Sequence, residues 1–363
     1  MIAEPLRELR DRFLGRGEAA ITVPPFDGAL KPNHLLEEAA VAAEFEAPED
    51  LASDGSTLFI ADGERILRLE RGGPVEAVRF DRPITALACI AGGGFALALN
   101  GREVRIVRGG ETLRSWKSGA GKPFLCVNAI SPAPDGRLFI TDGSERQPYE
   151  HWQRDLMELG DTGRLVALDP GTGDTRLVID GLAYAFGACA TSDGVYLSES
   201  WRHRLRYFDG GRAVLDRLPA YPSRIVAAAG GGFWLTAFTA RTQLVEFVLR
   251  EPIYRKRMMR EIEPRYWVAP ALSSGATYLE PMQGGHIKTM GILKPWAPPR
   301  SYGLVIRLGP DGLPRYSLHS RVDGKHHGVV AAIECRGDLF VLAKGARRLL
   351  RLSLAAIETE FGG

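Results

Sequence analysis

The sequence has little of what would place it in a specialised class of protein. Only 4 of its 363 residues are cysteine, each alone in an apolar segment, which predicts neither a disulfide framework nor a zinc knuckle. No segment approaches the roughly 18 apolar residues that a membrane-spanning helix needs. The 46 basic and 44 acidic residues leave a net charge of +2, so no strong field favours nucleic acid or a membrane as a partner.

Several catalytic motifs are missing as well. The sequence has no Gly-rich phosphate loop, no His-Glu-x-x-His helix, no Gly-x-Ser-x-Gly elbow and no cysteine pair at zinc spacing, which disfavours nicotinamide, P-loop, zincin and serine hydrolase chemistry. The first residues, "MIAEPLRELRDRFLGRG", mix acids and bases without the apolar core of a signal peptide. Together with the isolated cysteines, this predicts a cytoplasmic protein.

Glycine and short strands are abundant instead. Six segments each combine a strand of small residues, a turn mostly marked by Gly, and an alternating strand of bulky residues. They are "EDLASDGSTLFIADG", "ITALACIAGGGFALALN", "NAISPAPDGRLFITDGS", "FGACATSDGVYLSES", "RIVAAAGGGFWLTAF" and "HGVVAAIECRGDLFVLAKG". A strand near a central axis has little room and suits small residues, whereas the next strand packs between sheets and suits bulky β-formers.

A third alternating strand follows most of these hairpins, for example "RILRLERGG" and "RLRYFDGG". Six such units predict an all-β fold, a six-bladed β-propeller that forms a single domain over residues 1–363, since radial repetition protects the sheet edges. A parallel α/β fold is the weaker alternative, because no strand is regularly followed by a helix.

Three segments do not fit the blades. We expect residues 1–40 to form an N-terminal extension with a short amphipathic helix (Leu6, Leu9, Phe13, Leu14), residues 145–163 to form a helical insertion in the third blade, and residues 240–302 to form a helical and loop insertion in the fifth.

The long insertion contains the basic run Arg255–Arg260, which we interpret as a solvated helix face rather than a membrane surface. Its later part, residues 266–300, is expected to be a lid or a subunit contact, which leaves a homo-oligomer open.

Two stretches resemble a known family. "LFITDGSERQPYEHWQRDLMELGDTGRLVALDPGTGDTRLVIDGLAYAFGACATSDGVYLSESWRHRLRYF" and "LPAYPSRIVAAAGGGFWLTAF" resemble the strictosidine synthase-like family, which belongs with the paraoxonases and gluconolactonase-type lactonases in a wider group of six-bladed propellers. The resemblance is strong over residues 124–250 and extends from Glu49 to Leu352. It implies the fold, and does not imply one reaction.

The resemblance directs attention to the first residues of the inner strands, which ring one mouth of the central channel. We place them near Glu49, Thr85, Asn128, Phe186, Arg224 and His327.

In the calcium-dependent lactonases of the wider group, such positions supply oxygen ligands. Glu49 and Asn128 match that pattern, but Phe186 and Ser223-Arg224 do not. We therefore expect no cofactor, with calcium left only as a weak divalent site at Glu49 and Asn128.

The candidate catalytic residues follow from this ring. Glu49 or His327 would move a proton, while Arg224 and Asn128 would stabilise an oxyanion. The candidate substrate-binding residues are Phe186, Tyr184, Glu199, His203, Trp201, Tyr221 and Asp142.

A structural interpretation competes with each of these roles. Glu49 and Arg224 would form a salt bridge that plugs the channel, since buried charges must be paired. Asp142 would make a turn, Glu199 would support a loop, and His203 would be a packing or surface histidine.

The leading functional hypothesis is hydrolysis of an ester or lactone in a small organic substrate. One alternative is amine–aldehyde condensation, as the resemblance to strictosidine synthase implies, although the position that matches its glutamate lies near Val330, which cannot move a proton. The other alternative is a non-catalytic ligand-binding or scaffold propeller.

Overall fold

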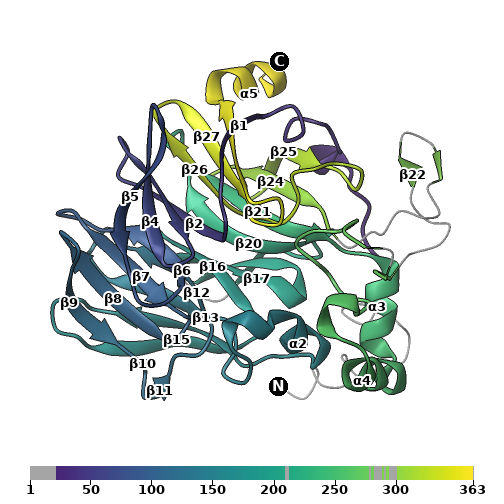
Figure 1. The fold of residues 1–363 in the computed structure, drawn as a ribbon, viewed down its shortest axis with the longest axis horizontal. Coiled ribbons are helices and arrows are strands. Elements are labelled where there is room, and N and C mark those ends of the chain that lie inside the picture. The colour runs from purple at the N-terminus through teal and green to yellow at the C-terminus, as the bar shows by residue number, and fades with distance from the viewer. Residues whose placement is uncertain are drawn as a thin grey trace.

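The computed structural model describes residues 22–208, 212–277, 279–281, 288–289, 292–293 and 301–362. Over these ranges the chain forms six four-stranded antiparallel sheets arranged as the blades of a propeller (Figure 1). The six-bladed fold predicted from the sequence is therefore confirmed. The helix expected around Leu6 to Leu14 lies outside the described residues.

Each predicted hairpin forms the two inner strands of one blade. These pairs are β2 (Pro48–Ser53) with β3 (Leu58–Asp62), β6 (Ile84–Cys89) with β7 (Phe95–Leu99), β12 (Val127–Pro132) with β13 (Leu138–Asp142), β16 (Ala185–Ala190) with β17 (Val195–Glu199), β20 (Ala220–Ala227) with β21 (Phe233–Ala240), and β26 (Val329–Cys335) with β27 (Asp338–Ala343). In Figure 1 the inner strands lie at the centre of the ring.

The outer strands complete the blades. The third strands are β4 (Arg65–Glu70), β8 (Glu103–Arg108), β14 (Gly163–Leu168), β18 (Arg204–Phe208), β24 (Gly303–Leu308) and β28 (Arg348–Ser353). The fourth strands are β5 (Gly73–Arg79), β9 (Glu111–Trp116), β15 (Thr175–Leu182), β19 (Arg212–Leu215), β25 (Pro314–Ser320) and β1 (Ala40–Glu44).

The last blade joins the two ends of the described chain. Strand β1 pairs antiparallel with β28, with Val41 opposite Leu350. The segment that precedes the first predicted hairpin therefore closes the ring, and β1 covers an edge of β28 that would otherwise be open to pairing. Helix α5 (Leu354–Phe361) follows β28 and is capped at its start by the side chain of Ser353.

The helical elements lie between strands of the third and fifth blades. A 3-10 turn, η3 (Tyr149–His151), and α2 (Trp152–Met157) separate β13 from β14; α3 (Gln243–Arg250), α4 (Pro252–Glu261) and η5 (Pro264–Tyr266) separate β21 from β24. Pro252 begins α4 because proline lacks an N–H and is tolerated only in the first turn. In Figure 1, α2, α3 and α4 gather on one side of the propeller.

The minor elements are η2 (Gly28–Leu30), β10 (Ser118–Gly119), β11 (Lys122–Pro123), η4 (Ser200–Arg202), β22 (Lys288–Thr289) and β23 (Ile292–Leu293). Within the part of the chain that is described, no helix combines the length and the apolar character needed to cross a bilayer.

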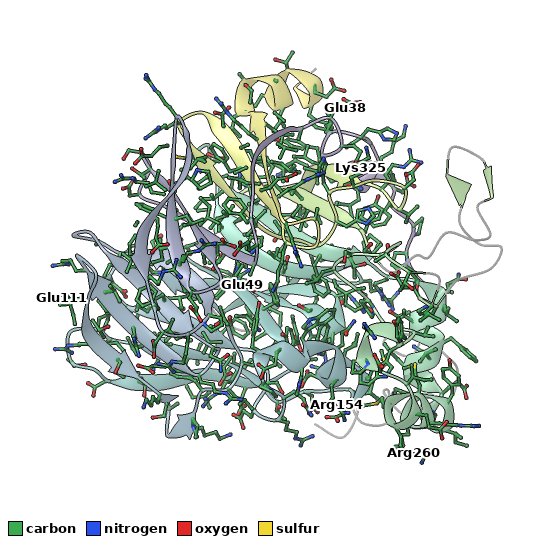
Figure 2. The ribbon with its side chains drawn as sticks, viewed as in Figure 1. Glu38, Glu49, Glu111, Arg154, Arg260 and Lys325 are labelled. Atoms are coloured by element: carbon green, nitrogen blue, oxygen red, sulfur yellow. The ribbon has the colours of Figure 1, made fainter. Side chains whose placement is uncertain are left out.

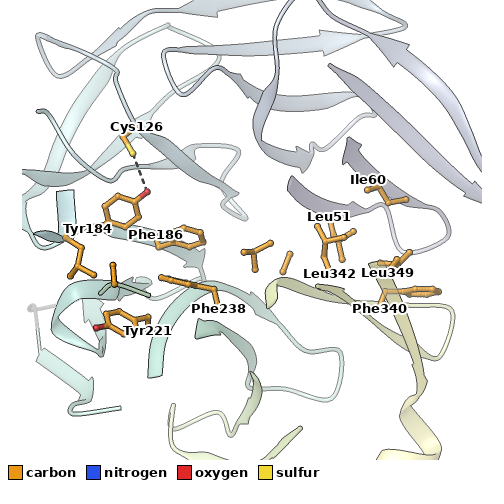
Figure 3. Packing of buried hydrophobic residues seen from close by; sticks show 14 of the residues in the cluster. Leu51, Ile60, Cys126, Tyr184, Phe186, Tyr221, Phe238, Phe340, Leu342 and Leu349 are labelled. Carbon is orange, nitrogen blue, oxygen red and sulfur yellow. Dashed lines mark hydrogen bonds between the residues drawn. The ribbon is translucent and has the colours of Figure 1, made fainter. Parts of the chain in front are cut away.

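One hydrophobic cluster connects the channel to these helices. Tyr184, Phe186 and Phe238 of the blades (Figure 3) belong to the same buried cluster as Met157 of α2 and Met258 of α4. The helical insertions therefore pack on the aromatic side of the propeller core instead of standing apart from it.

Candidate functional site

The inner strand of every blade is irregular at one corresponding place. The pairing register shifts at Glu49 in β2, Thr85 in β6, Asn128 in β12, Phe186-Gly187 in β16, Ser223-Arg224 in β20 and Val330 in β26. Such bulges leave one residue outside the ladder and redirect its side chain. Five of the six positions expected at the channel mouth therefore occupy equivalent places in their inner strands.

The sixth position was wrong. The equivalent residue of the last blade is Val330, not His327. His327 lies before β26, where its Nδ1 is 2.7 Å from the Ser301 hydroxyl and its Nε2 is 2.6 Å from the Arg321 carbonyl oxygen. Gly328 follows with a φ of +67° and turns the chain into the strand. Burial lowers the pKa of His327, so the ring stays neutral within this hydrogen-bond network.

Arg224 crosses the channel. Its Nη1 donates to the Glu49 carbonyl at 3.0 Å, and its Nη2 donates to the carbonyls of Thr85 at 2.9 Å and Asn128 at 2.7 Å. The guanidinium carbon lies 5.4 Å from the centre of the Phe186 ring. One side chain from the fifth blade therefore binds main-chain oxygens of the first three blades.

Two neighbouring acids surround this guanidinium. Asp50 Oδ1 is 3.1 Å from Arg224 Nε, and Glu49 Oε1 is 3.5 Å from Arg224 Nη2. Burial raises the pKa of Asp50 to about 6, although the charge of Arg224 opposes the shift. Burial alone would lower the pKa of Arg224, but the charges of Asp50 and Glu49 raise it. The arginine therefore stays charged and is neutralised in place.

Lys344 and Tyr149 extend the cluster. Lys344 Nζ donates to the Glu49 carboxylate, and also to the Tyr149 hydroxyl at 2.9 Å. The lysine side chain is 24% exposed, whereas that of Glu49 is 9% exposed, so Lys344 is the member that meets solvent. Burial and the nearby charge of Glu49 hold the pKa of Tyr149 well above its ordinary value. The hydroxyl therefore stays protonated.

The two oxygens of the Glu49 carboxylate face different cations. Its Oε1 is buried and accepts no hydrogen bond from any described residue, while the other oxygen, Oε2, binds Lys344. Figure 2 shows Glu49 near the centre of the propeller. The two acids and two cations balance in charge, so this cluster can exist in a largely buried place.

An aromatic wall adjoins the cluster. Tyr184 stacks on Trp201 with ring centres 4.3 Å apart, and Phe186 lies 5.9 Å from Tyr184. Trp152 of the third-blade insertion meets Trp201 at 6.2 Å. Trp201 Nε1 donates to Asp155 Oδ2 at 2.8 Å. The predicted aromatic residues are therefore together, under side chains of the insertion.

Asn128 has a supporting position. It is fully buried, and its Nδ2 donates to the Ala185 carbonyl at 2.8 Å. Its own carbonyl accepts from Arg224. The first contact connects the third blade to its neighbour, the fourth, and the second connects the third blade to the fifth across the channel.

Asp142 and Glu199 lie in buried ion pairs of their own. Asp142 Oδ2 is 2.9 Å from Arg164 Nη2, and its Oδ1 accepts from the Cys126 N–H at 2.7 Å. Glu199 accepts from the Ala183 N–H at 2.8 Å and from Arg204 Nε at 2.6 Å. Neither carboxylate is brought to Arg224, and each supports a local loop.

His203 also lies apart from Arg224. Its Nε2 is 3.5 Å from Glu246 Oε1 of α3, and its ring meets Tyr221 edge-on at 4.5 Å. Burial lowers the pKa of His203. These contacts attach α3 to the fourth and fifth blades.

Sequence comparisons agree with this architecture. The profile of the strictosidine synthase family matches residues 128–209. The human adipocyte plasma membrane-associated protein is 28% identical over 91% of this chain and 81% of its own length. Strictosidine synthase-like protein 6 of Arabidopsis thaliana is 28% identical over 44% of each chain. The chain is therefore similar in sequence to the strictosidine synthase-like family.

Solved structures share the fold of this strictosidine synthase-like propeller. A gluconolactonase from Xanthomonas campestris superposes with a TM-score of 0.56 at 15% identity, covering 88% of this chain and 91% of that one. A luciferin-regenerating enzyme gives 0.53 at 13% identity, covering 87% and 93%. At such identities the likeness shows the propeller fold alone.

The channel of this strictosidine synthase-like protein does not fit a calcium ion. Calcium needs six to eight oxygen ligands, and the Arg224 guanidinium already binds the oxygens of Glu49, Thr85 and Asn128. A dication placed beside this fixed positive charge would be repelled. No group of three or more metal-binding side chains is found among the residues that the structure describes.

Sequence reasoning missed three residues of the cluster around Arg224. Asp50 directly follows Glu49 and could have been considered with it. Tyr149 is carried by the third-blade insertion, and Lys344 by the turn after β27. No short motif connects these positions, since they meet only when the first, third and last blades come together.

Proposed function

We propose that this protein hydrolyses an ester or lactone without a metal ion, using Glu49, Lys344 and Tyr149. The observation that carries the proposal is the contact of Lys344 with both the Glu49 carboxylate and the Tyr149 hydroxyl. Lys344 is the solvent-facing member, so a small substrate would meet its ammonium group first. The substrate would bind next to Lys344, on the side of Arg224 that faces solvent.

Each group has a distinct role in the reaction. The Glu49 carboxylate would take a proton from water as the water attacks the substrate carbonyl. The Lys344 ammonium would stabilise the oxyanion that forms, while the neutral Tyr149 hydroxyl holds the ammonium in place. The proton on Glu49 then passes to the leaving alkoxide. An ester gives an acid and an alcohol, and a lactone gives a single hydroxy acid.

The other predicted site residues support this group. Arg224 would hold Glu49 and Asp50 at the channel, and Asn128 would hold the blades that carry them. His327, with both ring nitrogens in hydrogen bonds to other groups, has no part in the proposed reaction. The likeness to a gluconolactonase supports a lactone as substrate.

A scaffold role is the second candidate, and one observation favours it. Arg224 binds three carbonyls and lies between two carboxylates, as the plug of a closed channel would. Amine–aldehyde condensation is less supported, because the matching position holds Val330, which is 2% exposed and apolar.

All four cysteines are unpaired, which supports a reducing compartment such as the cytoplasm.

The test is turnover of a panel of lactones and aryl esters in the presence of EDTA. We expect hydrolysis by the wild type and a loss of at least about a hundredfold in Glu49→Gln and Lys344→Met. Lys117→Gln is the matched control, because Lys117 is an exposed lysine far along the chain from the cluster. Circular dichroism would show that each variant is folded.

The outcomes separate the two candidates. Activity that survives both substitutions would place the reaction elsewhere and overturn the assignment. An absence of turnover, with folded wild-type protein, would favour the scaffold.

A further inference from the structure

A second site lies outside the channel, between the two helical insertions. A cavity of about 450 Å³, open to solvent, is lined by residues of α2 and α4, which contact each other. Its charged lining comes from Arg154 and Glu158 near α2 and from Arg255, Lys256 and Arg260 of α4. Figure 2 labels Arg154 and Arg260 where these two helices face each other. The site shares no residue with the Glu49 cluster.

The most informative residue is Arg255. Arg255 is only 8% exposed, and its Nη1 donates to the Leu249 carbonyl. Its Nε is buried and has no hydrogen-bond partner among the described residues. Burial lowers the pKa of Arg255, and no acidic group of the described residues counteracts the shift. A buried guanidinium without a carboxylate is costly unless something else pairs with it.

The other cations of the cavity differ in their partners. Arg154 is 3.1 Å from Glu158, and Arg260 is 2.8 Å from Glu261. Lys256 is exposed and forms no ion pair within the described ranges. Two positive charges, those of Arg255 and Lys256, are therefore left for an anion, whereas the single carboxylate of the lining is already paired.

The remaining lining is apolar. Met157 and Met259 line the same cavity, and thioether side chains adapt to irregular apolar ligands. Ile253 and Tyr254, on the first turn of the same helix α4, are also exposed, at 84% and 49%. The surroundings suit a ligand with an anionic head and an apolar tail.

We propose that this cavity binds a phosphate monoester that carries an apolar chain. The phosphate group would lie between Arg255 and Lys256, because a charge between about −1.5 and −2 at neutral pH matches two cations. The guanidinium offers paired N–H donors to phosphate oxygens. The chain would contact Met157 and Met259. The ligand is either a soluble alkyl phosphate or the headgroup of a lipid such as phosphatidic acid.

The test titrates the full-length protein with hexyl phosphate by calorimetry, with inorganic phosphate and hexanol as comparisons. We expect saturable binding of hexyl phosphate that is tighter than that of inorganic phosphate, and none of hexanol. Arg255→Met should weaken binding by about tenfold or more, since a hydrogen bond to a charged group is lost. Lys256→Gln should weaken it as well, and its surface position preserves the fold.

Arg257→Gln is the matched control. Arg257 lies on the same helix and carries the same charge, but it pairs with Glu261 at 2.8 Å and does not line the cavity. It should bind hexyl phosphate like the wild type. Equal weakening in Arg257→Gln and in the two cavity variants would overturn the proposal, because general attraction to a basic helix would then explain the binding. An absence of saturable binding would also overturn it.

A vesicle experiment identifies the source of the phosphate. Sedimentation with phosphatidylcholine vesicles that contain phosphatidic acid, reduced by Arg255→Met and absent for phosphatidylcholine alone, would support the lipid headgroup. Binding of hexyl phosphate without sedimentation would support the soluble ester. Both results keep the phosphate site and differ only in what presents the phosphate.

Discussion

Arg224 Nη2 donates to the main-chain carbonyl of Asn128 at 2.7 Å, although the two residues are 96 positions apart and belong to the fifth and third blades. The same guanidinium reaches Glu49 in the first blade and Thr85 in the second. A propeller is held mainly by contacts between neighbouring blades. Here a single side chain adds direct bonds across the channel.

The first prediction concerns the stability that Arg224 provides. Arg224→Met keeps much of the side-chain length but leaves Glu49 and Asp50 without their buried counter-charge. We expect the free energy of unfolding to fall by about 3–5 kcal/mol, as measured by urea denaturation. Arg68→Met is the control, because Arg68 is 50% exposed and pairs only with Glu70. A loss for Arg224→Met no larger than that of the control would contradict the role of a plug.

The second prediction concerns calcium. Because the Arg224 guanidinium binds the oxygens at the centre of the ring, neither added calcium chloride nor EDTA should change the melting temperature of the wild-type protein. A ligand that binds only the folded state would raise it. The measurement is a thermal melt in each buffer, with magnesium chloride as a control for ionic strength. A rise seen with calcium alone would show that a calcium site exists despite Arg224.

Most of the blade structure could be predicted because the sequence signals for each hairpin lie within one short segment. A hairpin such as Asn128–Ser144 carries its alternation, its turn and its small first strand within one continuous segment. The closing strand β1 was not recognised, because Ala40–Glu44 is short and its partner β28 lies about 300 residues away in the chain. Ring closure depends on that distant pairing and on no local signal.

The candidate site was predicted only in part for the same physical reason. Glu49, Asn128 and Arg224 could be found because each occupies the same place in its own repeat. Val330, and not His327, occupies this place in the last blade, because the chain turns at Gly328 with a positive φ and β26 begins only at Val329. Contacts made by loops, such as that of Lys344 with Tyr149, depend on how blades meet and leave no pattern in either segment.

The third prediction concerns the contact between the long insertion and the last blade. A methyl group added at Gly345 would overlap the carbonyl of Leu272, which follows η5. The segment up to Leu272 is also tied to α2, since Gln153 Nε2 donates to the Pro270 carbonyl at 2.7 Å. We expect Gly345→Ala to lower the free energy of unfolding by about 1–3 kcal/mol and to increase hydrogen exchange in residues 264–272.

Gly230→Ala is the matched control for this substitution. An added methyl group at Gly230 meets nothing within 4 Å, so its stability and hydrogen exchange should stay close to those of the wild type. If Gly345→Ala also left exchange in residues 264–272 unchanged, the insertion would not be held by this contact. Because Gly345 adjoins Lys344, the same variant should alter turnover if the proposed reaction is correct.

The last prediction concerns acid stability and Glu246 of α3. Burial raises the pKa of this carboxyl, but its hydrogen bonds with His203 and Arg241 outweigh burial and lower the pKa to about 2. A folded-state pKa below the ordinary value of 4.5 means that the ionised group stabilises the fold above pH 4.5. That stabilisation, roughly 3 kcal/mol at most, is lost as the pH falls from about 4.5 to 2. Urea denaturation at a series of pH values should therefore show that the free energies of unfolding of wild type and Glu246→Gln differ clearly at pH 7 and converge in acid.

Glu261→Gln, a substitution of an exposed carboxylate on α4, is the control and should differ much less from the wild type at every pH. A gap for Glu246→Gln that stays constant down to pH 3 would mean that packing of the side chain, and not its charge, attaches α3 to the blades.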